Sequence, residues 1–73
     1  MKQYVEVIAK FGLDGEVYPK YLVFKNKTYP IDTILNVRPS SLDKGVALLY
    51  ECLIKGQTHH LFFDRERWFV RYR

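Results

Sequence analysis

The sequence predicts an all-β protein, built as a small antiparallel barrel or rolled sheet of five to six strands. Three observations support this fold class. Apolar residues recur with a period of two, short polar turns separate the apolar segments, and aromatic and β-branched residues are frequent within them. The chain has 73 residues, of which 48% are hydrophobic, and this suits a single domain over residues 1–73 with one packed core.

The first two strands are predicted over residues 4–11 and 18–25. In the first, every odd-numbered residue is apolar, which gives the strand one buried face. Residues 12–15 combine two glycines with an aspartate and are typical of a turn. Pro19 lacks a backbone donor, so we expect it at the beginning of the second strand or at an unpaired edge.

A polar break at residues 25–28 predicts a hairpin. Residues 29–37 then fit either one bent strand or two short strands around residues 32–33. Pro30 argues for an edge strand or a bulge, because it cannot donate to a sheet ladder. Residues 38–45 form the longest polar interval, and they are predicted to be an irregular loop.

Residues 46–55 fit two kinds of secondary structure. As a strand, the even-numbered residues from Val46 to Ile54 form an apolar face. As a helix over residues 42–55, an apolar stripe at helical spacing and Gly56 as a C-terminal cap would give an α+β fold instead. The hairpin-like break at residues 55–58 favours the strand, which would pair with residues 59–63.

The last two strands are predicted at residues 59–63 and 68–72, around a turn at 64–67. Pairing Asp64 with Arg67 places Phe62 opposite Phe69. One face is then the core, and it carries Leu61, Phe63, Trp68, Val70 and Tyr72. The other is an outer face, and it carries His60, Phe62, Arg67, Phe69, Arg71 and Arg73.

The outer face of this C-terminal hairpin is the candidate binding surface. The chain carries a formal net charge of +4, and its second half holds all five arginines. Protein–protein interaction is the preferred function, with the patch docking an acidic or aromatic segment. The alternative is single-stranded nucleic acid, with bases stacked on Phe62 and Phe69 and phosphates on the arginines. Arginine stems lying over the two rings would instead make an ordinary solvated surface.

Catalytic and metal chemistry have little support in the sequence. His59 and His60 are adjacent and point to opposite faces of a strand, so they do not form a joint metal site. The single cysteine, Cys52, excludes an intrachain disulfide. We therefore expect a non-enzyme without metal or cofactor. The alternative from another class is a small thiol-dependent enzyme or enzyme subunit that uses Cys52 with a histidine.

The chain begins without a secretory signal and has no stretch of transmembrane length, so we expect a cytoplasmic protein that does not contact membranes. Several predicted strands are apolar on both faces, including residues 21–24 and 46–50. A one-layer barrel buries only its inside, so some of these side chains should be exposed. Exposed apolar area of this kind predicts a homodimer.

Two segments carry a resemblance to a known group of proteins. FGLDGEVYPKYLVFKNKTYPI and YECLIKGQTHHLFFDRERWFV are similar to short bacterial SH3-like barrel proteins of unknown function. In those proteins, an acidic-glycine turn precedes an aromatic strand, and a penultimate strand ends in an aromatic-Asp pair before a last strand that contains Trp. The resemblance implies a barrel that binds rather than catalyses, and it carries over no functional residues.

Overall fold

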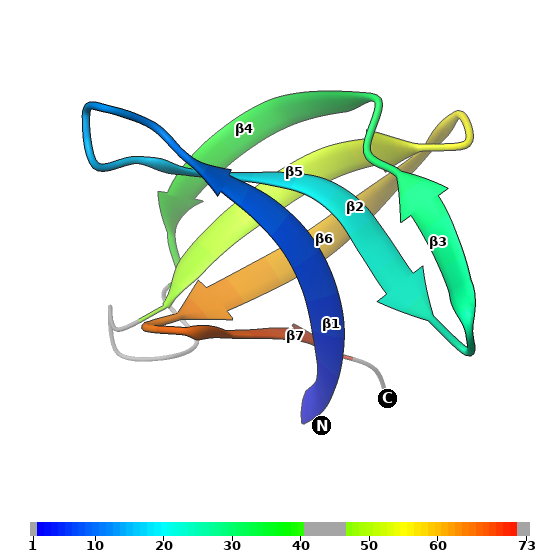
Figure 1. Ribbon diagram of the computed structural model, residues 1–73. Coiled ribbons are helices and arrows are strands. Elements are labelled where there is room, and N and C mark those ends of the chain that lie inside the picture. The colour runs from blue at the N-terminus through cyan, green and yellow to red at the C-terminus, as the bar shows by residue number, and fades with distance from the viewer. Residues whose placement is uncertain (1, 41–46, 72–73) are drawn as a thin grey trace.

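The protein forms one curled antiparallel sheet, seen in a computed structural model that describes residues 2–40 and 47–71 (Figure 1). Its strands are β1 (Lys2–Phe11), β2 (Val17–Phe24), β3 (Lys27–Pro30), β4 (Thr33–Pro39), β5 (Leu48–Ile54), β6 (Gln57–Asp64) and β7 (Arg67–Arg71). They lie in the order β3-β2-β1-β7-β6-β5-β4, and the described residues contain no helix. The all-β prediction is confirmed, whereas the strand count is seven rather than five to six.

Strand β1 joins two halves of the sheet, one made of β2 and β3 and the other of β7, β6, β5 and β4. Its first residues pair with β7, from Lys2 opposite Arg71 to Val5 opposite Trp68, and the remainder of β1 pairs with β2. The register with β2 shifts just after Ile8, where β2 contributes a proline. Bulges of this kind bend a strand and increase its twist. The bend in β1 therefore lets the two halves face each other, as Figure 1 shows.

The curled sheet is a half-barrel. Strands β3 and β4 are its two edges and do not pair with each other, so the rolled sheet is confirmed and a closed barrel is not. Residues 31–32, the corner that joins β3 to β4, instead make one backbone hydrogen bond to each neighbouring strand. The Ile31 amide donates to the Lys20 carbonyl at 2.9 Å, and the Asp32 amide donates to the Leu53 carbonyl at 2.9 Å. The corner therefore ties β2 to β5 where the sheet leaves a gap.

Of the two alternatives for residues 29–37, the structure has the two separate strands, β3 and β4. Pro30 ends β3, which is an edge strand as its missing donor predicts. Pro19 lies within β2 beside the register shift rather than at a strand start or an edge. Of the predicted loop at 38–45, Arg38 and Pro39 belong to β4, and residues 41–46 lie outside the described residues.

The ambiguous segment is a strand, which confirms the favoured prediction, and the alternative helix over 42–55 is wrong for residues 48–54. Residues 42–46 of that helix lie outside the described part of the chain. Strand β5 pairs with β6 along its whole length, from Leu48 opposite Phe63 to Ile54 opposite Gln57. The turn that joins them has φ of 51° at Lys55 and 76° at Gly56. Two consecutive positive φ values make a two-residue hairpin turn whose twist matches the strands, and this turn fixes β5 as a strand.

The main core fills part of the concave side of the half-barrel. Its buried residues are Tyr50, Cys52, Leu61 and Trp68, and the Trp68 ring lies 5.2 Å from that of Tyr50 between ring centres. The Tyr50 hydroxyl donates to the Val17 carbonyl at 2.7 Å and so links β5 to β2 across the inside. This core matches the face predicted for the C-terminal hairpin, apart from Tyr72, which lies outside the described residues.

Apolar side chains are also present on the outside. Ile8 and Tyr21 face each other on neighbouring strands and are 48% and 43% exposed. Leu35 and Val37, on the edge strand β4, are exposed to a similar degree, whereas Ala47 is buried. Of the residues for which exposure was expected, Tyr21 is exposed and Ala47 is buried, and self-association stays a prediction. Among the residues that the structure describes, no helix is long and apolar enough to cross a bilayer.

Candidate functional site

The candidate site is the outer face, by which we mean the convex surface of β4, β5, β6, β7 and the first half of β1. The predicted register of the C-terminal hairpin is confirmed: Asp64 pairs with Arg67, and Phe62 pairs with Phe69. Neighbouring strands extend the same face on both sides. One row across five strands consists of Arg38, Leu49, Phe62, Phe69 and Tyr4.

The two phenylalanines of this face are buried, which corrects the prediction that they are exposed contact residues. Phe69 is 0% exposed and Phe62 is 5% exposed. Their rings stack in parallel with centres 5.1 Å apart, and Ala47 and Leu49 pack against them. Alternation along a strand assigned the two rings to the correct face, but it could not show what covers them. In this arrangement neither ring is available to stack on a base.

Cations lie over the aromatic layer. The Lys2 ammonium is 4.6 Å from the centre of the Phe69 ring, and the Arg71 guanidinium is 5.4 Å from Phe62 and 5.5 Å from Phe69. The Arg67 guanidinium lies 4.5 Å from the centre of the Tyr4 ring. Contacts of this kind favour a cation over the negative face of a ring. The outer face therefore presents positive charge above a buried apolar layer, as expected if arginine stems cover the rings.

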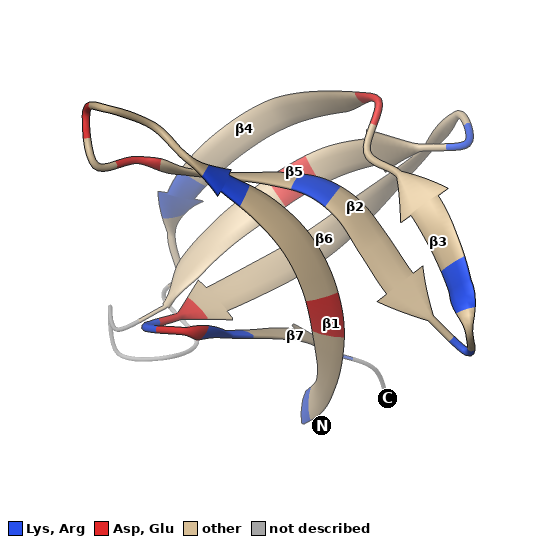
Figure 2. Cartoon of the chain, viewed as in Figure 1, with Lys and Arg blue, Asp and Glu red and all other residues tan. Residues whose placement is uncertain are grey.

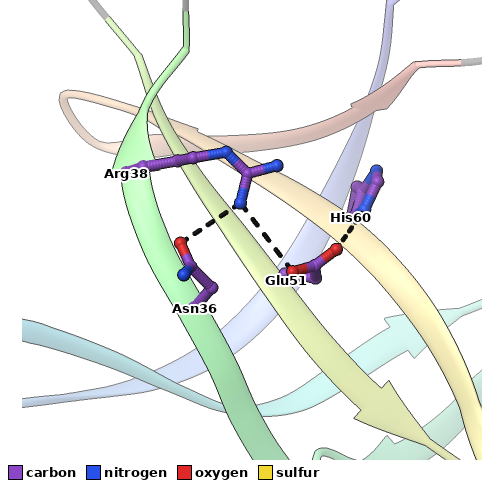
Figure 3. A network of polar contacts seen from close by, with 4 residues as sticks. All are labelled: Asn36, Arg38, Glu51 and His60. Carbon is purple, nitrogen blue, oxygen red and sulfur yellow. Dashed lines mark hydrogen bonds and ion pairs between the residues drawn. The ribbon is translucent and has the colours of Figure 1, made fainter.

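A polar network occupies the neighbouring row of the outer face (Figure 3). The Arg38 guanidinium donates to the side-chain oxygen of Asn36 at 3.1 Å and lies 3.8 Å from one carboxylate oxygen of Glu51. The other carboxylate oxygen of Glu51 is 3.2 Å from Nε2 of His60. The predicted site residue His60 is thus exposed and belongs to a cross-strand network over β4, β5 and β6. Glu51 offsets positive charge at this end of the outer face.

Several residues of the outer face were absent from the predicted site, among them Lys2, Tyr4 and Arg38. Tyr4 is 49% exposed, which makes it the accessible aromatic ring beside Arg67. The alternation of the first strand already placed Tyr4 away from the core. Its position beside the C-terminal hairpin depends on the pairing of β1 with β7, which nothing local in the sequence indicates. The predicted residue Arg73 lies outside the described part of the chain.

Charge is distributed unevenly around the sheet (Figure 2). Acidic residues mark the turns between β1 and β2 and between β6 and β7, as well as positions on β1 and β5. In the first of these turns, Asp14 accepts a hydrogen bond from the Glu16 amide at 3.0 Å, and this bond lowers the pKa of the Asp14 carboxyl. Such backbone bonding is the ordinary role of aspartate in a turn.

Cys52 lies inside the main core and is 0% exposed. Burial raises the pKa of its thiol to about 11. His59 is the residue opposite Cys52 on the neighbouring strand, so the pairing considered for a thiol enzyme does occur. The environment nevertheless favours the neutral thiol, whereas a nucleophilic cysteine needs the thiolate. Within residues 2–40 and 47–71, no three His, Cys, Asp or Glu side chains gather as metal ligands would.

Alkylation of the native protein should therefore be slow. At pH 8, a thiol whose pKa is about 11 is ionised to roughly one part in a thousand. We expect iodoacetamide to label Cys52 at the rate of global unfolding, and the rate to rise steeply as urea is added. Mass spectrometry over a time course measures the rate at which Cys52 is labelled at each urea concentration. Rapid labelling without denaturant would contradict the expectation and would support the thiol-dependent enzyme.

No family model matches the chain, and neither a curated protein nor a solved structure matches it. The chemistry of its own surface is therefore the guide to its partners. On the outer face that chemistry consists of cations held over rings, an exposed tyrosine and a network around Glu51.

Proposed function

We propose that the protein is a non-catalytic binding module that docks an acidic segment of a protein partner on the outer face. The observation that carries the proposal is the placement of Lys2, Arg67 and Arg71 over aromatic rings across two neighbouring strands. A cation over a ring keeps its charge and is held in place at little further entropic cost. Preorganised charge of this kind steers an oppositely charged partner and fixes its orientation.

A protein partner is favoured over single-stranded nucleic acid by the state of the rings. Sequence-tolerant binders of single strands stack successive bases on exposed aromatic side chains. Here Phe62 and Phe69 are buried, and Tyr4 is the exposed ring among the aromatic residues of the outer face. One accessible ring supports contact with an aromatic or aliphatic side chain of a peptide. The tight curl and the short hairpins also support the proposed relation to SH3-like small barrels.

A titration with an acidic peptide tests this proposal. The probe is a peptide rich in Asp and Glu that contains one aromatic residue, and binding is followed by fluorescence anisotropy at low salt. The double variant Lys2→Gln with Arg67→Gln should weaken binding about tenfold, since each exposed charge contributes up to about 1 kcal/mol. Added salt should weaken the wild-type complex as well, because exposed charges are screened.

The matched control is Lys10→Gln with Lys20→Gln, which removes the same charge from exposed positions outside the outer face. This control should keep the wild-type affinity. Equal loss in both double variants would mean that net charge alone attracts the peptide, and the proposed face would be wrong. Single-stranded DNA and RNA are titrated in parallel. If they bind and the peptide does not, the face is a nucleic-acid surface instead.

A further inference from the structure

The concave side of the half-barrel contains a hollow next to the main core, with a volume of about 510 Å³. Strands β1, β2, β3, β5, β6 and β7 all contribute to its wall. The apolar part of the wall consists of Val5, Leu22, Phe24, Tyr29, Ile54, Leu61 and Val70. Pockets for small ligands have volumes of about 300–1,000 Å³ and are lined mainly by apolar side chains. The hollow therefore has the size and the lining of a ligand site.

Part of the apolar wall of the hollow remains exposed to solvent. Ile54 and Leu61 are buried at its base, whereas Leu22, Phe24 and Tyr29 face the inside but stay only half-buried. Strands β3 and β4 do not pair, so the sheet is open at this end and these side chains keep part of their surface exposed. Apolar surface that faces inward and remains in contact with water gains stability when a ligand covers it.

The polar residues that line the hollow are basic or neutral, namely Lys55, Gln57, Thr58, His59, His60 and Arg71. Lys55 holds its ammonium 5.1 Å from the centre of the Tyr29 ring, so the turn between β5 and β6 reaches across to β3 at the mouth. His59 shares the inward-facing parity of Leu61 and also lines the hollow, together with Gln57 and Thr58. Among the described residues that line it, none is aspartate or glutamate. The mouth therefore complements an anion.

We propose that this hollow binds an amphipathic ligand with an apolar chain and a carboxylate end. The chain lies against Leu22, Phe24 and Val70, and the carboxylate lies at the mouth beside Lys55. The apolar wall of this site is on the concave side of the sheet, and Arg71, whose guanidinium lies over the outer-face rings, also lines the hollow. Ligand binding here does not depend on the function proposed for the outer face, and the two can be tested separately.

The first test uses the wild-type protein and ligands that differ in one property at a time. Octanoate, decanoate and dodecanoate are titrated by calorimetry below their micellar concentrations. Each added methylene that is buried should tighten binding about fourfold. Nonyltrimethylammonium has the nine-carbon alkyl chain of decanoate with the opposite charge, and it should bind at least about fivefold more weakly. Equal affinity for the two head groups, or no increase with chain length, would overturn the proposal.

Two variants locate the ligand. Val70→Phe fills part of the hollow and should abolish decanoate binding without lowering the melting temperature. Lys55→Gln should weaken decanoate about twofold to fivefold and leave decanol unchanged, and Lys10→Gln is its charge-matched control. Binding that survives Val70→Phe in a folded protein would place the ligand elsewhere. The outer-face variant with Lys2→Gln and Arg67→Gln should bind decanoate normally, so failure of one proposal is distinguishable from failure of the other.

Discussion

Replacing Phe69 with alanine is expected to destabilise the protein by about 3–5 kcal/mol. The ring is 0% exposed, stacks on Phe62 and contacts the edge of Tyr4 with ring centres 5.8 Å apart. Its removal leaves a void in the outer apolar layer that the surrounding side chains fill only partly by relaxing. A domain of 73 residues has a total stability of about 4–11 kcal/mol, so the variant should lose much or all of its folded population at room temperature.

Urea denaturation followed by far-ultraviolet circular dichroism measures this loss. Phe11→Ala is the matched control, because it deletes the same side chain from a position that is 70% exposed. The control should change the free energy of unfolding by less than about 0.5 kcal/mol. If Phe69→Ala costs as little as the control, the ring is exposed in solution. Base stacking on the outer face would then again be a tenable function.

Replacing Trp68 with alanine should cost a similar amount, about 3–5 kcal/mol, on the opposite side of the same strand. The Trp68 ring is 6% exposed and lies 4.6 Å from the ring of Phe63 and 5.2 Å from that of Tyr50. Losing it opens the main core where β5, β6 and β7 meet. Trp68→Phe keeps most of the apolar contact and should be distinctly less harmful.

The decisive outcome is the comparison of the two alanine variants. Similar losses mean that β7 is buried on both faces, with one apolar layer inside the curl and a second outside. A large loss for Trp68→Ala alone would mean that only the concave side is a core. Chemical denaturation of both variants under the same conditions gives this comparison, with circular dichroism as the signal because one variant lacks the tryptophan.

The sequence predicted those parts of the fold that depend on neighbouring residues. Period-two alternation and polar breaks located the strands, and the break at Lys55 and Gly56 correctly favoured β5 over a helix. The register of the last hairpin followed from its turn. Closure of the sheet could not be predicted, because it depends on how strongly the whole sheet curls and not on the residues between its two edge strands. The short corner at residues 31–32 joins β3 to β4 without letting them pair.

The site was predicted less well for a related reason. Alternation places Phe62 and Phe69 on one face but gives no information about a second layer, which here includes Ala47 from outside the hairpin. Lys2 and Tyr4 come to this face from the other end of the chain. A strand pair separated by more than sixty residues leaves no local pattern, so these contributors were absent from the predicted site.

The pairing of β1 with β7 has a consequence for how the chain is made. The first of the seven strands in chain order lies in the middle of the finished sheet, beside the last of them. The β1–β2–β3 meander and the β4–β5–β6 meander can each form early, because their strands are neighbours in the chain. Until β7 pairs with them, β1 and β6 are unpaired edge strands, and such edges can pair with strands of other chains. Strand β7 joins the two meanders, so the sheet is complete only after β7 has been synthesised and has paired with both β1 and β6.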